Sequence, residues 1–168
     1  TSALEENEIE YMISGSLALN HYVMPRMTMD LDLIIELDRG NIEQFLNVFT
    51  ENEYYLNPTS VREEVIRKGM FNLIDLESGI KVDFIVRKQG EYRKNEFSRR
   101  VRKRLGDYEV WIVRAEDLII SKLDWIQRLE SEKQKLDIRN LLQLKNLDRE
   151  YLQYWVKKLN LQTFGLLD

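Results

Sequence analysis

The chain has 168 residues, with 25 Lys and Arg against 29 Asp and Glu, a net charge of −4, one histidine and no cysteine. These values exclude disulfides, thiolate metal ligands, a cysteine nucleophile and a multi-histidine metal site, and they are typical of one domain, with or without a helical extension, in the reducing cytoplasm. No apolar run approaches the ~20 residues that cross a bilayer, so we expect no membrane partner, and the carboxylates leave oxygen-liganded cations such as Mg²⁺ as the natural metal class.

The first half of the chain predicts alternating strands and helices. Strands are expected over residues 8–14 and 28–37, and helices over 16–23 and 41–50. Gly15 ends the first strand, and Pro25 stops the helix that follows it. Alternate residues of the second strand form one apolar face, namely Met29, Leu31, Leu33 and Ile35. Because the first strand lies so close to Thr1, we expect a further helix to precede Thr1 in the natural protein.

The second half predicts a hairpin and then a helical region. The strands "MFNLIDL" and "IKVDFIV" are joined by "ESG", and a short strand follows over 108–113. Helices are expected over 115–130, 135–144 and 148–159. The order predicts an α/β (α+β) fold, a small mixed sheet flanked by helices with a C-terminal helical lobe. We expect a catalytic domain over 1–114 and the helical lobe over 115–168.

Two aspartates interrupt the second strand. Asp30 and Asp32 are two residues apart and therefore project from one face. Buried carboxylates this close repel each other, and a divalent cation offsets the repulsion. Asp83 interrupts the second hairpin strand in the same way, and if that strand lies beside the first, three carboxylates converge and can hold two Mg²⁺ ions about 4 Å apart. For an isolated Asp-x-Asp, a solvated strand end or a turn cap is the simpler interpretation.

The Gly15-Ser16 pair changes that balance. A strand that ends in Gly-Ser and opens a helix offers free backbone N–H groups and a positive helix end to a phosphate. Gly15 permits close approach of the backbone, and Ser16 adds a hydroxyl. Together with the carboxylates, this pattern indicates a nucleotide site. Metal-dependent glycosyltransferases also use Asp-x-Asp, but that alternative leaves Gly15, Ser16 and Asp83 unexplained.

The stretch "ISGSLALNHYVMPRMTMDLDLII" resembles the first motif of the nucleotidyltransferases of the DNA polymerase β superfamily. Within it, the chain is most similar to the AbiEii-type toxins of abortive-infection and toxin–antitoxin systems, in which Arg-x-Thr/Ser precedes the aspartate pair, as Arg26 and Thr28 do here. Asp83 matches the third carboxylate. The later helical motifs are matched by Lys122, Arg128 and Asp137.

This resemblance implies a nucleotidyltransferase fold and transfer of a nucleoside monophosphate from an NTP to an acceptor hydroxyl, with release of pyrophosphate. It implies that Asp30 and Asp32 bind two Mg²⁺ ions (or Mn²⁺), and that Asp83 joins the second ion and helps the hydroxyl lose its proton. Further roles fall on Gly15 and Ser16 at the β- and γ-phosphates, Lys122 as a neutralising cation, and Arg26 and Thr28 as further phosphate-binding candidates. A cognate antitoxin is an implied partner. The rival hypothesis is a non-catalytic nucleotide- or partner-binding module.

Several candidates also have simpler interpretations. Arg26 could pair with a local carboxylate, and Thr28 could bond the backbone at the strand start. Lys122 lies at the edge of an apolar stripe, where a lysine is usually at the surface. Helix pairs are expected for Asp124 with Arg128 and for Asp137 with Arg139, and core positions are expected for Trp111, Trp125 and Trp155.

The segment 87–104 is strongly basic, with Tyr92 and Phe97 among its cations. It could form an electrostatic and stacking surface for an RNA or DNA acceptor such as tRNA. The alternative is a solvated helix or loop that balances an acidic remainder.

Overall fold

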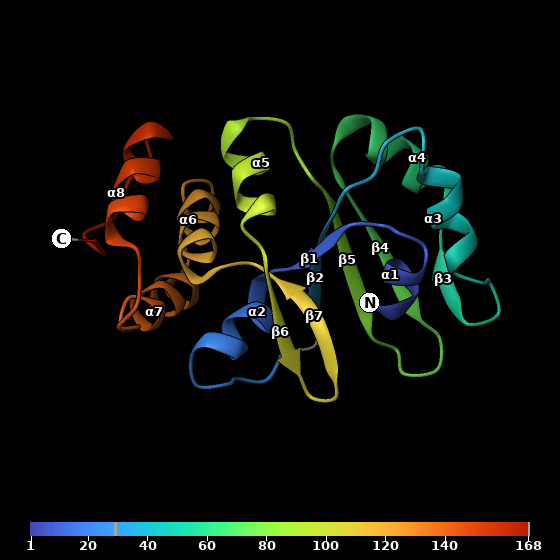
Figure 1. The fold of residues 1–168 in the computed structure, drawn as a ribbon, viewed down its shortest axis with the longest axis horizontal. Coiled ribbons are helices and arrows are strands. Elements are labelled where there is room, and N and C mark those ends of the chain that lie inside the picture. Colours follow the sequence, from blue (N-terminus) through green and yellow to red (C-terminus); the bar gives the residue numbers. More distant parts are fainter. Residues whose placement is uncertain (29, 168) are drawn as a thin grey trace.

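The computed structural model describes residues 1–28 and 30–167 and contains one mixed sheet with helices on both sides (Figure 1). The sheet order is β3-β4-β5-β2-β1-β7-β6. The strands are β1 (Tyr11–Ile13), β2 (Asp30–Ile35), β3 (Tyr54–Leu56), β4 (Met70–Asp75), β5 (Lys81–Val86), β6 (Val101–Leu105) and β7 (Tyr108–Ile112). The helices are α1 (Ser2–Glu6), α2 (Gly15–Tyr22), α3 (Ile42–Val48), α4 (Pro58–Arg67), α5 (Glu91–Ser98), α6 (Ala115–Ile126), α7 (Glu132–Leu141) and α8 (Arg149–Lys158).

The strand with the two aspartates lies inside the sheet. β2 pairs antiparallel with β1 on one side and parallel with β5 on the other. The expectation that the second hairpin strand lies beside the aspartate strand is therefore confirmed, and the register places Asp32 next to Asp83. Met29, which the sequence placed on the apolar face of this strand, lies outside the described residues.

The two faces of the sheet have different covers. On one face, Phe45 of α3 packs against Phe71 and Phe84, with ring centroids 5.4 and 5.2 Å apart. Phe71 and Phe84 are adjacent in sequence to Asn72 and Asp83, so the polar pair points to the opposite face. One face therefore anchors the sheet in the apolar core, while the other presents the carboxylates.

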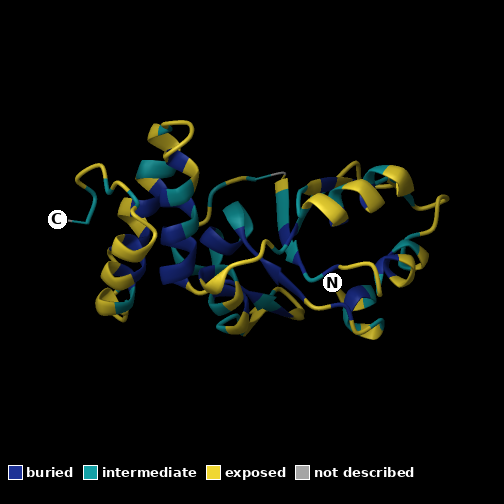
Figure 2. Cartoon of the chain, turned by 90° about the horizontal axis from the view of Figure 1, so that it is seen from above, coloured by how far each residue is buried: buried dark blue, intermediate teal, exposed yellow. Residues whose placement is uncertain are grey.

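The C-terminal helices α6, α7 and α8 pack together, as the sequence predicted (Figures 1 and 2). Their inner sides are buried, and Leu118 and Leu123 of α6 belong to the same apolar cluster as Met12 of β1. The mixed α/β fold with C-terminal helices is confirmed, whereas the boundary between residues 114 and 115 stays a prediction. No helix of the described chain has both the length and the apolarity of a membrane span.

Five elements were not predicted, namely α1, β3, α4, α5 and β6. Three of them have weak signals because α1 and β3 are very short and β6 carries the charged sequence "VRKRL", which becomes a strand by pairing with β7. By contrast, α4 has a readable start, because Asn57 caps it and Pro58 occupies its first turn.

We expect Phe45→Ala to lower the free energy of unfolding by about 3–5 kcal/mol, because Phe45 is fully buried among aromatic rings. Urea denaturation followed by circular dichroism measures this change. Tyr55→Ala is the control, since Tyr55 is 58% exposed and such a change alters stability by at most about 0.5 kcal/mol. Similar losses in both variants would contradict the proposed anchoring of the sheet.

Candidate active site

The carboxylates of β2 and β5 form a row on the open face of the sheet. Asp32 is in register with Asp83, and Asp30 is in register with Lys81. Partners in register on neighbouring strands point to the same face, as do residues two apart on one strand. Asp30, Asp32 and Asp83 therefore project to one side.

Neighbouring side chains hold the carboxylate of Asp83. Asn72 of β4 donates a hydrogen bond to it, and the Lys81 ammonium lies 3.1 Å from its Oδ2 atom. Within residues 1–28 and 30–167, no group of three or more acidic or histidine side chains is arranged to hold a metal ion. The chemistry of the donors nevertheless fits Mg²⁺, which prefers carboxylate oxygens.

The turn into α2 lies directly against Asp32. Gly15 has φ of 59°, in the left-handed region, and a Cβ atom at this position would collide with Oδ2 of Asp32. Ser14 is the N-cap residue, but its side chain makes no capping hydrogen bond. The first turn of the helix therefore offers backbone N–H groups beside the carboxylate.

The electrostatics of this row favour an added cation. Burial raises the pKa of Asp32, and the negative charges of Asp83 and Asp30 raise it further, against the opposing effect of Lys122 and a hydrogen bond from the Ser16 backbone. A carboxylate whose pKa is raised in this way is destabilised in its charged form. A divalent cation beside it would relieve that cost.

A second group of charges lies behind the Gly-Ser turn. Nη2 of Arg26 donates to Oγ of Ser16 at 2.9 Å and to Oδ2 of Asp137 at 3.0 Å. The Lys122 ammonium donates to the same Asp137 oxygen at 2.9 Å. Asn20 holds the backbone of Arg26 through two hydrogen bonds, of 2.8 and 3.0 Å. Asp137 therefore bridges the two cations and fixes the Ser16 hydroxyl through Arg26.

Two simpler interpretations of these residues are wrong. Lys122 is only 5% exposed, because α7 covers it and Gln134 and Asp137 accept its hydrogen bonds. Asp137 pairs with Arg26 and Lys122 rather than with Arg139. The expected pair of Asp124 with Arg128 is present at 3.7 Å.

The pKa values of Lys122 and Asp137 are both shifted downward. Burial lowers the pKa of Lys122, although the hydrogen bond and charge of Asp137 act against this. Burial acts to raise the pKa of Asp137, but hydrogen bonds from Arg26 and Lys122 outweigh it, so this pKa lies below its usual value.

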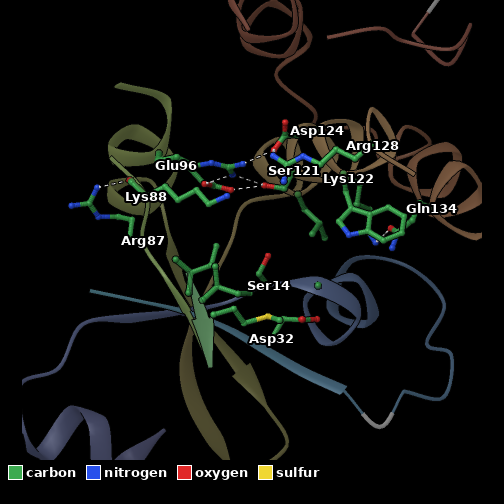
Figure 3. A pocket seen from close by; sticks show the side chains of 17 residues that line it. Ser14, Asp32, Arg87, Lys88, Glu96, Ser121, Lys122, Asp124, Arg128 and Gln134 are labelled. Atoms are coloured by element: carbon green, nitrogen blue, oxygen red, sulfur yellow. Dashed lines mark hydrogen bonds and ion pairs between the residues drawn. The ribbon is translucent and has the colours of Figure 1, made fainter. Parts of the chain in front are cut away.

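A cavity of about 340 Å³ opens over Asp32 of the carboxylate row (Figure 3). Its floor includes Asp32, and its opposite wall comes from α5 and α6, where Glu96, Ser121 and Asp124 are linked through Arg93. Trp125 also lines the cavity and is 45% exposed, so its predicted core position is wrong. Trp155 is buried as predicted, and Trp111 is half-buried.

The basic segment 87–104 is largely paired within the chain. Its arginines form ion pairs with acidic residues, namely Arg87 with Glu36, Arg93 with Glu96, Arg99 with Asp117, Arg100 with Glu10, Arg102 with Glu5 and Arg104 with Asp107. Tyr92 and Phe97 are each 5% exposed, so the predicted stacking role of these rings is wrong. Lys88, Lys94 and Lys103 form no ion pair with the described part of the chain.

The structure brings together most of the predicted site. Gly15, Asp32 and Lys122 line the cavity. Asp83 lies beside Asp32 in register, and Ser16 follows Gly15 at the start of α2. Asp30 is exposed at the start of β2, and its backbone N–H donates to the Thr28 hydroxyl at 3.3 Å, as the simpler interpretation of Thr28 predicted. The sequence interpretation missed the supporting residues, namely Asn20, Asn72, Lys81 and Gln134, because none of them belongs to a motif with a chemical meaning of its own.

Comparisons with known proteins agree with this geometry. A family described as "Nucleotidyl transferase AbiEii toxin, Type IV TA system" matches residues 8–162. ANT(2")-Ia in complex with adenylyl-2"-tobramycin has a TM-score of 0.63 at 11% identity, over 95% of this chain and 91% of that chain. The lincosamide antibiotic adenylyltransferase LnuA, lincomycin-bound, has a TM-score of 0.55 at 11% identity, over 84% and 91%.

A third solved structure, an antigenic nucleotidyltransferase-like protein from Paracoccidioides brasiliensis, has a TM-score of 0.51 at 19% identity, over 99% of this chain and 87% of that one. At such identities these structures show the fold alone. Among curated proteins, none matches the chain significantly.

We expect Gly15→Ala to destabilise the fold and to weaken nucleotide binding, because the added methyl group meets the Asp32 carboxylate. Gly106→Ala is a matched control, since Gly106 has the same φ of 59° but nothing within 4 Å of an added Cβ atom. The backbone conformation alone costs about 1–2 kcal/mol, so urea denaturation should show a loss of that size for Gly106→Ala and a larger one for Gly15→Ala. Equal losses would contradict the close approach.

We expect Asp32→Asn to raise the melting temperature at neutral pH. Because the pKa of Asp32 is raised in the folded state, the folded state binds its proton more tightly, and stability falls as pH rises through the range above the ordinary aspartate pKa. The variant escapes this loss, so its advantage should shrink as the pH falls toward the ordinary value. Thermal unfolding between about pH 4 and 8 measures it, at about 2–4 °C for each kcal/mol. A variant less stable than wild type at neutral pH would refute the repulsion.

Proposed function

Because the chain belongs to the AbiEii nucleotidyltransferase family of type IV toxin–antitoxin systems, we propose that it transfers a nucleoside monophosphate from an NTP to a hydroxyl group of an acceptor. The main observation that supports this proposal is the contact between the Gly15 turn and Asp32, together with the position of Asp83 beside Asp32 in register. In this reaction the acceptor oxygen forms a bond to the α-phosphorus while the bond from that phosphorus to the β-phosphate oxygen breaks. Pyrophosphate leaves.

Residues of the Gly15 turn hold the phosphates in this proposal. The free N–H groups at the start of α2 bind the β- and γ-phosphate oxygens, and Gly15 lets the backbone approach them. The Ser16 hydroxyl, which accepts a hydrogen bond from Arg26, is held ready to donate to a phosphate oxygen. The buried Lys122 ammonium, held by Asp137, supplies positive charge near the phosphates. The Thr28 hydroxyl accepts a hydrogen bond from the Asp30 backbone at the start of β2.

The donor set fits Mg²⁺ or Mn²⁺, because the carboxylates of Asp30, Asp32 and Asp83 share a face, and because burial and the charges of Asp83 and Asp30 raise the pKa of Asp32. Two such ions, when bound, neutralise charge that develops on the reacting phosphoryl oxygens. Asp83 lies on β5, on the side of Asp32 away from the Gly15 turn. In this proposal its carboxylate accepts the proton of the acceptor hydroxyl.

The acceptor and the partners are the open part of this proposal. We favour a nucleic-acid acceptor such as tRNA, because Lys88 of the basic segment, which has no ion-pair partner among the described residues, lies at the cavity. A cognate antitoxin and a cytoplasmic location are expected from the family and the lack of cysteine. Family membership gives no support to the glycosyltransferase alternative. A non-catalytic binding module is distinguished from the enzyme by the transfer assay.

We expect the wild-type protein with α-³²P-labelled NTPs and Mg²⁺ to label an acceptor in a pool of deacylated tRNA, and Asp32→Ala to reduce labelling at least about a hundredfold. Asp107→Ala is the control, because the Asp107 side chain is 97% exposed and far from the row in the chain. Labelled RNA is counted after gel electrophoresis. Equal labelling by wild type and Asp32→Ala would refute the assignment of the carboxylates, and binding of NTP without transfer to any acceptor would favour the non-catalytic module.

A further inference from the structure

We propose that three apolar side chains beside the carboxylate row form the acceptor subsite, and that they receive the terminal nucleoside of a single-stranded nucleic acid. We call this set the apolar shelf; it consists of Ile34, Ile85 and Met70. This inference rests on the proposed nucleotidyl transfer and specifies its second substrate.

The order of the strands separates the two substrates. β2 has β1 on one side and β5 on the other, and α2 follows directly from β1. Phosphates held at the start of α2 therefore lie on the β1 side of Asp32. Asp83 lies on the β5 side, so the hydroxyl that it activates approaches over β5 and β4.

The apolar shelf lies in that direction and adjoins the carboxylates. Ile34 pairs with Ile85, and Ile85 pairs with Met70, each two residues along its strand from Asp32, Asp83 or Asn72. The shelf thus points to the same face as the carboxylate row. All three side chains line the cavity, and Met70 is 51% exposed. Neighbouring strands are about 4.8 Å apart, so the shelf spans about 10 Å, the width of a nucleoside.

The charges that line the cavity beside the apolar shelf favour binding of an anionic acceptor. The cations that line the cavity are Arg87, Lys88, Arg93, Lys122 and Arg128, and the carboxylates are Asp32, Glu96 and Asp124 (Figure 3). The described chain gives Lys88 no ion-pair partner, whereas Arg93 is tied to Glu96 and Asp124, and Arg87 is paired with Glu36 outside the cavity lining. An excess of positive charge beside an apolar surface suits a nucleobase followed by phosphates. It disfavours a polycationic acceptor of the tobramycin type.

The test measures nucleic-acid binding and nucleotide binding separately. The probes are fluorescein-labelled single strands of about twelve nucleotides, as RNA and as DNA, with either a normal or an abasic 3′-terminal nucleotide. Fluorescence anisotropy at about 50 mM salt gives their affinity. Thermal shift with NTP and Mn²⁺ gives nucleotide binding. The variants are Met70→Glu and Lys88→Glu, with Tyr108→Glu as the control because Tyr108 is 64% exposed on β7 and does not line the cavity.

We expect Met70→Glu and Lys88→Glu to weaken binding of the intact strand at least about tenfold, while the control and the NTP-induced thermal shift stay unchanged. Met70→Glu should have less effect on the abasic strand, because that strand has no terminal base to place on the shelf. A preference for RNA or DNA identifies the source of the acceptor, and either supports the subsite.

Equal losses for the intact and abasic strands would overturn the role of the apolar shelf. Failure of the wild type to bind either strand, or displacement of bound strand by tobramycin with transfer to tobramycin instead, would overturn the acceptor class. A protein that binds the strands but shows no thermal shift with NTP would instead refute the proposed nucleotidyl transfer, so the two failures are distinguishable.

Discussion

The repulsion between Asp32 and Asp83 is the constraint around which this molecule is arranged. Pairing of β2 with β5 places the two carboxylates side by side in a half-buried row, where neither is well hydrated. Asn72 and Lys81 hold Asp83, and the Ser16 backbone bonds to Asp32. The compensation is partial, because the pKa of Asp32 remains raised. Burial and the neighbouring charges of Asp83 and Asp30 together raise this pKa, and a cation bound at the row would offset both.

The rest of the structure keeps this row in place and open. Packing of Phe45 on Phe71 and Phe84 fixes one face of the sheet, so the opposite face is left for chemistry. On that open face, the bridge from Arg26 through Asp137 to Lys122 joins the loop after α2 to the C-terminal helices. The Gly15 turn and the helical wall of the cavity are therefore held together by charge as well as by apolar packing.

The sequence patterns were sufficient to predict β1, β2, β4, β5, β7, the Gly15 turn and the carboxylate positions, because these depend on local period and residue type. Burial of Lys122 was not predictable, since it depends on how α7 packs over α6. Likewise, the partner of Asp137 is Arg26, which lies 111 residues away in the chain. The stacking surface predicted for the basic segment 87–104 was wrong for the same reason. Its arginines pair with carboxylates on distant elements, and its aromatic rings are buried.

A crystal structure with Mn²⁺ and a non-hydrolysable NTP analogue, with the metal located by anomalous scattering, tests the central claim most directly. The account predicts manganese bound by the carboxylates of Asp32 and Asp83, with Lys81 released from Asp83 and the triphosphate over Gly15 and Ser16. Manganese and triphosphate bound elsewhere, with Asp83 still held by Lys81 and Asn72, would contradict it.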